Sequence, residues 1–257
     1  MSTAVEAARR RRRTSVVSWA AALFAVVLPA LALAGPPFET DDPEPPGYRH
    51  YEVYLVTQYD QGAGRHVETL PRFEINYGVM PNVQLSFATE RSWARGSEEG
   101  APRFGTSELG LKMRFLPETK YRPQVAFYPS VVWSGESTRG SDTKVFLPLW
   151  GQKSWGRSTV YGGGGRWHNP GPLNRDFWFA GVAMLRQVSD TLTLGAEVFH
   201  STAESVDTVS STGFNVGGLS ALGEDHSVLF SIGRSSTPGS LSAYLAYGIS
   251  LGPKTTR

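Results

Sequence analysis

The sequence predicts an all-β protein, a closed antiparallel up-and-down transmembrane β-barrel of about 12 strands. First, apolar and polar residues alternate along segments of about nine to twelve residues, the length with which a tilted strand crosses a bilayer. Second, short and long connections alternate between these segments. Third, the chain of 257 residues has 28 glycines, 12% aromatic residues and no cysteine, and few of its stretches show a helical period.

The stretch SELGLKMRF at residues 107–115 shows the alternation that defines such a strand. Leu109 and Leu111 lie on one face and Glu108 and Lys112 on the other, because successive side chains of a strand point to opposite sides. We expect strands over residues 48–59, 69–79, 82–90, 105–116, 122–134, 143–153, 157–168, 176–187, 191–200, 212–222, 226–234 and 240–251.

The connections favour a membrane barrel over a soluble β-sandwich, which is the alternative fold. Outer-membrane barrels join their strands by short turns at one end and by longer loops at the other, whereas a sandwich has no reason to sort its connections. The expected short turns are 80–81, 117–121, 154–156, 188–190 and 223–225. The expected long loops are 60–68, 91–104, 135–142, 169–175, 201–211 and 235–239.

Charged residues of both signs lie on the polar faces of the expected strands, Glu197 among them. Unpaired charge is costly in a dry core, so these residues fit a watery lumen, although in a sandwich they would face solvent. Aromatic residues on the same faces would line a path for a solute, or would simply fill a narrow barrel. The candidate lumen residues are Arg72, Glu74, Glu108, Lys112, Arg114, Tyr128, Lys144, Phe146, Trp150, Gly162, Gly164, Arg166 and Trp178.

The run of four glycines in VYGGGGRWHNPG, residues 160–171, is not a phosphate-binding loop. Such a loop places Lys and then Ser or Thr after its glycines, and here Arg166 and Trp167 follow them. With a turn at 154–156, we expect Gly164 to face Phe146 and Gly162 to face Pro148 inside the barrel. The glycines would then make room for neighbouring rings or for a solute.

The first 34 residues have the layout of a secretory signal peptide, with a membrane anchor as the alternative. Five arginines at 9–13 precede an apolar run at 16–33, and we expect cleavage after Ala34. The leader holds five of the 25 basic residues and one of the 23 acidic ones, so the mature chain has a net charge of about −2. This charge leaves no basic surface that would indicate a nucleic-acid partner.

A proline-rich acidic segment at 35–47 precedes the expected barrel at 48–252, and a tail at 253–257 follows it. Proline interrupts strand pairing, so this segment is not a barrel strand. We expect it to insert into the lumen, to meet a periplasmic partner or to remain a solvated leader. Phe38, Asp41 and Asp42 are its candidate contact residues.

The sequence does not favour an enzyme, a metal site or a cofactor. No pair of its histidines has the spacing of a zinc motif. His200, Ser201 and Glu204 are the one candidate for a lipid hydrolase, but no nucleophile-elbow motif is present, and adjacent side chains of a strand point in opposite directions.

Several stretches resemble the family of outer-membrane transporters named for the meta-pathway of phenol degradation. They are GPPFETDDPEPPGYRHYEVYL (35–55), FEINYGVMPNVQLSF (73–87), SELGLKMRFLPE (107–118), FLPLWGQKSWG (146–156), YGGGGRWHNPG (161–171) and LTLGAEVFH (192–200). The resemblance implies an exported β-barrel and, by the family's name, a link to aromatic catabolism.

Together these observations lead us to expect an outer-membrane barrel that passes small hydrophobic or aromatic solutes. The alternatives are a non-conducting structural or partner-binding barrel and an outer-membrane lipid-modifying enzyme. The expected partners are outer-membrane lipid, a small-molecule solute and the barrel-assembly machinery.

Overall fold

The computed structural model describes residues 37–62, 65–95, 103–134 and 143–253. The expected signal peptide at 1–34 therefore lies outside the described residues. No helix in the described residues is long and apolar enough to cross a membrane.

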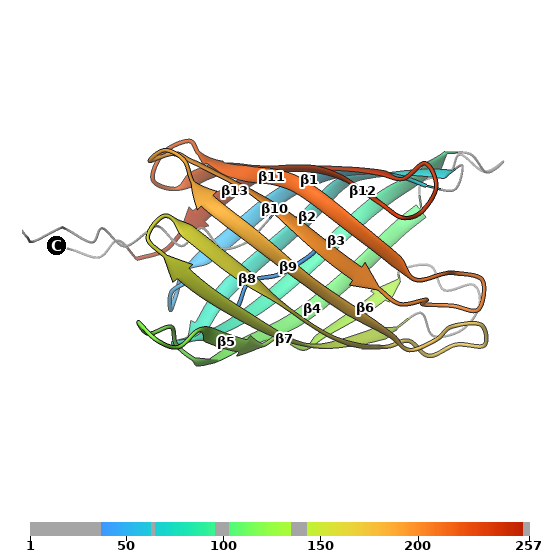
Figure 1. Ribbon diagram of the computed structural model, residues 1–257, viewed down its shortest axis with the longest axis horizontal. Helices are drawn as coiled ribbons and strands as arrows, with labels where there is room; N and C mark the ends of the chain where they lie inside the picture. Colours follow the sequence, from blue (N-terminus) through green and yellow to red (C-terminus); the bar gives the residue numbers. More distant parts are fainter. Residues whose placement is uncertain (1–36, 63–64, 96–102, 135–142, 254–257) are drawn as a thin grey trace, which may run out of the picture. The chain divides into compact units, whose positions relative to one another are not determined.

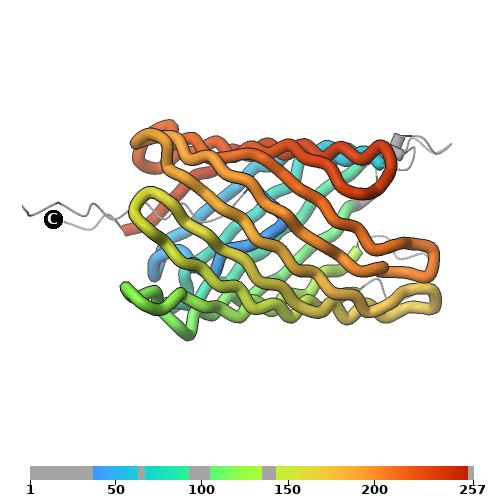
Figure 2. Tube along the Cα trace, viewed as in Figure 1, coloured from blue at the N-terminus to red at the C-terminus, as the bar shows by residue number. Residues whose placement is uncertain are grey.

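The described chain after residue 50 forms one closed antiparallel sheet, whose tilted strands are visible in Figures 1 and 2. Neighbours in the ring are also neighbours in the sequence, except that β5 and β6 each pair with both β4 and β7, and β1 pairs with β13 to close the ring. The strands are β1 (Tyr51–Gly62), β2 (Arg65–Met80), β3 (Val83–Arg95), β4 (Arg103–Leu116), β5 (Gln124–Phe127), β6 (Ser130–Ser134), β7 (Lys144–Trp155), β8 (Ser158–His168), β9 (Phe177–Gln187), β10 (Leu192–Ser201), β11 (Ser211–Ala221), β12 (His226–Ser235) and β13 (Leu241–Leu251).

The short strands β5 and β6 are two halves of one crossing, so the described strands make a closed barrel of 12 crossings. The break falls at Tyr128 and Pro129, directly beside Pro148 of β7, whose carbonyl accepts a hydrogen bond from the Tyr128 N–H at 3.2 Å. Proline has no N–H to donate to a ladder. Because Pro129 and Pro148 are adjacent, the regular hydrogen bonding of the sheet is interrupted at one site and not at two.

The connections lie at two ends of the barrel. We call the end that carries residues 81–82, 117–123, 156–157, 188–191 and 222–225 the turn end. The opposite end, which carries 169–176, 202–210 and 236–240, is the loop end. The expected long loop at 60–68 is wrong, because β1 continues to Gly62 and β2 begins at Arg65.

The two faces of the sheet have the reverse of the polarity found in a soluble protein. Large apolar side chains such as Leu55, Val198 and Phe214 are more than half exposed on the outside, where lipid would cover them. Polar and charged side chains are buried on the inside, among them Asn76, Lys112 and Glu197. This arrangement confirms the membrane barrel over the sandwich.

The expected register of the glycine run is wrong, and the error moves its side chains to the other face. β7 continues to Trp155 and β8 resumes at Ser158, so the turn is the two residues 156–157, with Gly156 at φ 58°. Such a two-residue turn shifts the pairing by three positions, and an odd shift exchanges the faces of a strand.

In the observed register Phe146 faces Trp167, Trp150 faces Gly163, and Gly164 faces Leu149. Leu149 is 52% exposed on the outside, so Gly164 and Gly162 belong to the outer face and not to the lumen. Arg166 also lies on the outer face, at the loop end. The inner face of β8 carries Tyr161, Gly163, Gly165 and Trp167 instead.

Trp178 is likewise not a lumen residue, because it pairs with Arg166 and is 59% exposed. β9 is apolar on both faces, so alternation could not choose between them. The inner face is identified by Phe177, which stacks on Trp167 inside the barrel, and by Phe179, which meets Phe146 there edge to face.

Candidate functional site

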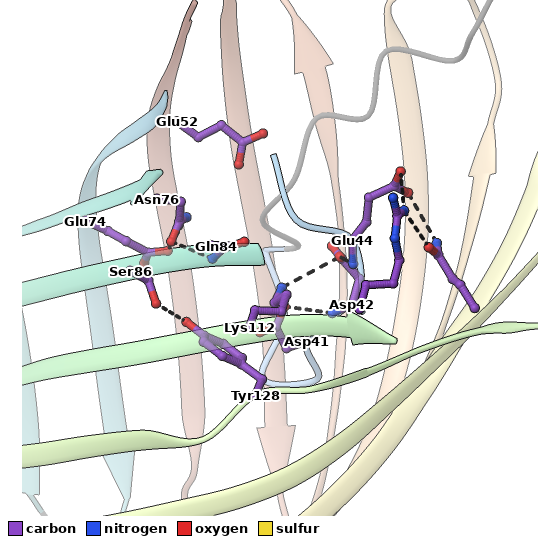
Figure 3. Close-up of polar contacts among 12 residues, drawn as sticks. Asp41, Asp42, Glu44, Glu52, Glu74, Asn76, Gln84, Ser86, Lys112 and Tyr128 are labelled. Atoms are coloured by element: carbon purple, nitrogen blue, oxygen red, sulfur yellow. Dashed lines mark hydrogen bonds and ion pairs between the residues drawn. The ribbon is translucent and has the colours of Figure 1, made fainter. Parts of the chain in front are cut away.

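Residues 37–46, which we call the plug, lie inside the barrel and make no strand (Figure 3). Thr40 and Pro43 are almost completely buried, and Asp42 is only 9% exposed. The chain enters at the turn end, where the Arg49 N–H donates to the carbonyl of Gly78 at 2.7 Å. The plug therefore extends from the turn end toward the loop end.

The tip of the plug is bound by Glu197 of β10. The backbone N–H groups of Glu39 and Thr40 donate to the two carboxylate oxygens of Glu197 at 2.8 and 2.9 Å. Asn215 of β11 donates its amide N–H to Oε1 of the same carboxylate at 2.6 Å, which fixes the orientation of Glu197. Hydrogen bonds to a charged acceptor are the stronger kind, so Glu197 is the main anchor of the tip.

The base of the plug is held by cations of β4. Nζ of Lys112, which is 3% exposed, lies 3.0 Å from Oδ1 of Asp41 and 3.8 Å from Oδ1 of Asp42. Arg114 lies 3.4 Å from Glu44, which also accepts a hydrogen bond from Gln124. Three of the four acidic residues of the plug thus meet the lumenal cations that alternation places on the inner face of β4.

A glycine of β9 gives the plug its space. A side chain at Gly181 would collide with the hydroxyl oxygen of Thr40. Gly163 of β8 faces Gly181 across the strand pair, so two neighbouring strands present no side chain at this level of the lumen. The wall is therefore hollowed where the plug passes closest to it.

A cavity of about 320 Å³ lies beyond the tip of the plug, toward the loop end. Pro37, Phe38, Glu39 and Asp41 of the plug form its floor. Its two walls differ in chemistry.

One wall is aromatic. Phe146 and Trp167 stack with their ring centroids 4.4 Å apart, and Trp167 stacks in turn on Phe177 at 5.7 Å. Trp150 and Phe179 each meet the Phe146 ring edge to face at 6.3 Å. Phe146, Trp150 and Trp167 line the cavity directly. Rings packed in this way hold one another rigid and present a fixed apolar surface.

The other wall is polar and comes from β1, β2, β4, β13 and the bend between β5 and β6. Gln58, Arg72, Glu74, Glu108, Tyr128 and Tyr244 line it. The Arg72 guanidinium lies 3.5 Å from both Glu74 and Glu90. Tyr128 is positioned at the base of this wall, where its hydroxyl lies 2.6 Å from the Ser86 hydroxyl.

Glu39 lies on the floor of the cavity, and the barrel wall surrounds the cavity. This enclosure, together with the nearby Glu197 carboxylate, raises the pKa of Glu39 to about 7.

The structure brings together on the inner face nine of the thirteen candidate lumen residues, and four lie outside. Those inside are Arg72, Glu74, Glu108, Lys112, Arg114, Tyr128, Lys144, Phe146 and Trp150. Those outside are Gly162, Gly164, Arg166 and Trp178. Of the plug candidates, Phe38 lies on the cavity and Asp41 and Asp42 lie beside Lys112.

Arg166 has a structural partner at the loop end. It lies 2.7 Å from Asp176, which also accepts hydrogen bonds from the His168 ring at 3.1 Å and from the Asn169 N–H at 2.8 Å. The Asn169 N–H, then the His168 contact, hold the pKa of Asp176 below its usual value. This network ties the outward-facing Arg166 to the loop at 169–176.

The proposed hydrolase residues are not brought together. His200 hydrogen-bonds to the Thr212 hydroxyl at 2.8 Å, whereas the Ser201 hydroxyl donates to the carbonyl of Thr202. Among the described residues, no group of three or more His, Cys, Asp or Glu side chains is arranged to hold a metal ion.

No family model matches the sequence, and no curated protein sequence is significantly similar to it. Solved structures are similar in fold. The COG4313 outer membrane channel from Pseudomonas putida F1 is 13% identical, with a TM-score of 0.62 over 83% of this chain and 100% of that one. The KdgM porin is 11% identical, with a TM-score of 0.54 over 77% of this chain and 99% of that one.

The translocator domain of the autotransporter NalP from Neisseria meningitidis is 15% identical, with a TM-score of 0.51 over 97% of this chain and 96% of that one. At these identities the likeness shows the fold, which is that of outer-membrane barrels.

Proposed function

We propose that this protein is an outer-membrane channel for small solutes, and that hydrophobic or aromatic compounds are the solutes its lumen fits. The observation that carries the proposal is the cavity of about 320 Å³ inside the barrel, with an aromatic wall on one side and a polar wall on the other. A volume of this size holds a solute of about one ring with its substituents.

The similarity in fold to barrels that are described as a channel and a porin supports this proposal. So does the polarity of the barrel, because an apolar outside and a charged inside suit a wall between lipid and water. We propose further that the chain reaches the outer membrane after export and removal of residues 1–34, with the barrel-assembly machinery as its partner in insertion.

In our proposal the plug closes the channel in this structure. Its base is bound to Lys112 and Arg114 and its tip to Glu197, so a solute that enters from the loop end meets Phe38 and Glu39 as the floor of the cavity. Passage would require the tip to leave Glu197.

Planar-bilayer recordings test the proposal with the wild-type barrel, a deletion of residues 35–46 and the variant Glu197→Gln. Each charge-assisted hydrogen bond is worth roughly 1.5–3 kcal/mol, and about 1.4 kcal/mol corresponds to a tenfold change in an equilibrium. We therefore expect Glu197→Gln to raise the open fraction about tenfold or more, and the deletion to raise the conductance further.

Glu224→Gln is the matched control, because Glu224 is exposed in the turn between β11 and β12. It should leave the current unchanged. If correctly folded barrels of all four proteins pass neither ions nor a small aromatic solute, the channel proposal is wrong and a non-conducting barrel is favoured.

A further inference from the structure

The charges around the cavity are unbalanced. Among the described residues that line it, the carboxylates are Glu39, Asp41, Glu74 and Glu108, whereas Arg72 is the one cation. Asp41 is paired with Lys112 at 3.0 Å, which removes one negative charge from the count. The remaining three carboxylates still outnumber the single guanidinium.

Arg72 cannot neutralise this excess. It is shared between Glu74 and Glu90, each at 3.5 Å, and a third carboxylate, Glu108, lies on the same wall. An excess of negative charge in a cavity with low-dielectric walls produces an electric field that attracts mobile cations. The polar wall therefore favours a cation in the cavity and disfavours an anion.

The aromatic wall suits the other part of such a guest. Phe146, Trp150 and Trp167 line the cavity. Because Trp167 is stacked between Phe146 and Phe177, this wall offers apolar contact and not an open ring face for a cation. An ammonium group would be attracted by the carboxylates, and an attached apolar group would be covered by the rings.

An unused donor lies at the same place. Nε1 of Trp150 has no hydrogen-bond partner among the described residues, although Trp150 is only 2% exposed and lines the cavity. A buried N–H without a partner is costly. Because protein covers this nitrogen, it plays no part in the recognition of an ammonium group.

We propose that the cavity binds small organic cations, in which an ammonium group faces Glu39, Glu74 and Glu108 and an aromatic or compact apolar group lies against Phe146 and Trp167. This inference deepens the proposed function, because it names the charge of the solute that binds in the channel. Its consequence for transport rests on the proposed function. It predicts that neutral aromatic compounds bind more weakly and that aromatic carboxylates are rejected.

Isothermal titration calorimetry of the purified barrel in neutral detergent tests the inference with three probes that share one ring. They are benzylammonium, benzyl alcohol and benzoate, measured at about pH 8, where Glu39 is mostly ionised. We expect benzylammonium to bind about tenfold more tightly than benzyl alcohol, and benzoate not to bind measurably. Equal affinities of the three, or tighter binding of benzoate, would overturn the inference.

The double variant Glu74→Gln with Glu108→Gln isolates the role of charge. It should lower the affinity for benzylammonium about tenfold, to that of benzyl alcohol, and leave benzyl alcohol unchanged. The single variant Glu108→Gln keeps the pair of Arg72 with Glu74, so it serves as the second measurement if the double variant does not form a barrel. An unchanged affinity for benzylammonium in a folded variant would contradict the inference.

Bilayer currents separate the two proposals. A barrel that conducts and is blocked by benzoate, but not by benzylammonium, would leave the channel standing and defeat the cation site. A barrel that binds benzylammonium tightly, yet passes no current even without residues 35–46, would leave the cation site standing and defeat the channel.

Discussion

Glu197 shows what a single residue contributes to this lumen. Alternation places its carboxylate inside the barrel, but the sequence does not reveal that this carboxylate accepts hydrogen bonds from the backbone N–H groups of residues 39 and 40. Backbone N–H groups carry no sequence signature, so this contact could not be predicted. The same holds for Gly181, which matters because of Thr40, a residue 141 positions earlier in the chain.

The contact between Gly181 and Thr40 leads to a prediction. Gly181→Ala should place a methyl group against the Thr40 hydroxyl and displace the tip of the plug, because the two cannot occupy the same space. We expect a higher open fraction in bilayer recordings. The double variant Gly181→Ala with Thr40→Gly should restore the closed state, since it removes the colliding hydroxyl; failure of this rescue would show that the alanine acts on the wall alone.

Glu39 leads to a pH-dependent prediction. In the seated plug the pKa of Glu39 is raised from 4.5 to about 7, so protonation of Glu39 stabilises the seated plug. This stabilisation is fully present below pH 4.5, the ordinary pKa of Glu, and is lost as the pH rises through about 7. The charges that shift this pKa most are the carboxylates of Glu197 and Asp60, which raise it, and the guanidinium of Arg72, which lowers it; Asp41, Glu74 and Glu108 line the same cavity. We expect solute flux into liposomes to be higher at about pH 8 than at about pH 5.

Glu39→Gln should abolish most of this pH dependence and keep flux at its low-pH level. If the variant shows the same rise as the wild type, another group is responsible for it.

At the scale of strands, the sequence was most informative about where strands lie and least informative about register. Expected and observed bounds agree closely for β4, at 105–116 against Arg103–Leu116, and for β13, at 240–251 against Leu241–Leu251. The pairing of β7 with β8 depends on whether the turn has two or three residues. Since Ser154, Trp155 and Gly156 all tolerate either arrangement, the inner face of β8 was assigned wrongly.

The corrected register changes which glycine of the run is essential. Gly163 has φ 156°, and a side chain there would strike the carbonyl oxygen of Leu149. We expect Gly163→Ala to lower the stability of the barrel by about 1–3 kcal/mol. The temperature at which the folded band is lost on a semi-native gel measures this effect.

Gly151→Ala is the matched control on the neighbouring strand, because the nearest atoms to a side chain there lie 3.8 Å away, at ordinary contact distance. It should shift the transition little. Similar losses in the two variants would show that the glycines act through strand propensity and not through close approach.

At the scale of the whole molecule, the alternation of polarity and the sorting of connections together specified a membrane barrel. The plug could be anticipated only as one of several roles for the acidic segment, because solvated leaders have the same composition. The cavity could not be anticipated at all, since its walls come from strands whose mutual placement depends on closure of the ring.

A closed barrel of this kind should resist sodium dodecyl sulfate until it is heated. We expect the protein from the outer-membrane fraction to migrate faster on a gel when unheated than when boiled, because the intact sheet stays compact and binds less detergent. Identical migration before and after boiling, with the protein in the soluble fraction, would contradict the membrane barrel.

The bond between Thr40 and Glu197 joins residues 157 positions apart, and that separation sets an order of events. The plug segment precedes every strand in the chain, yet its anchor lies on the tenth strand in sequence and is oriented by Asn215 of the eleventh. Contacts between residues so far apart form late, because most of the chain must be ordered before they can close. The plug segment is therefore synthesised before the strands but is among the last parts to reach its native position. A barrel that has closed before the plug binds Glu197 would be open.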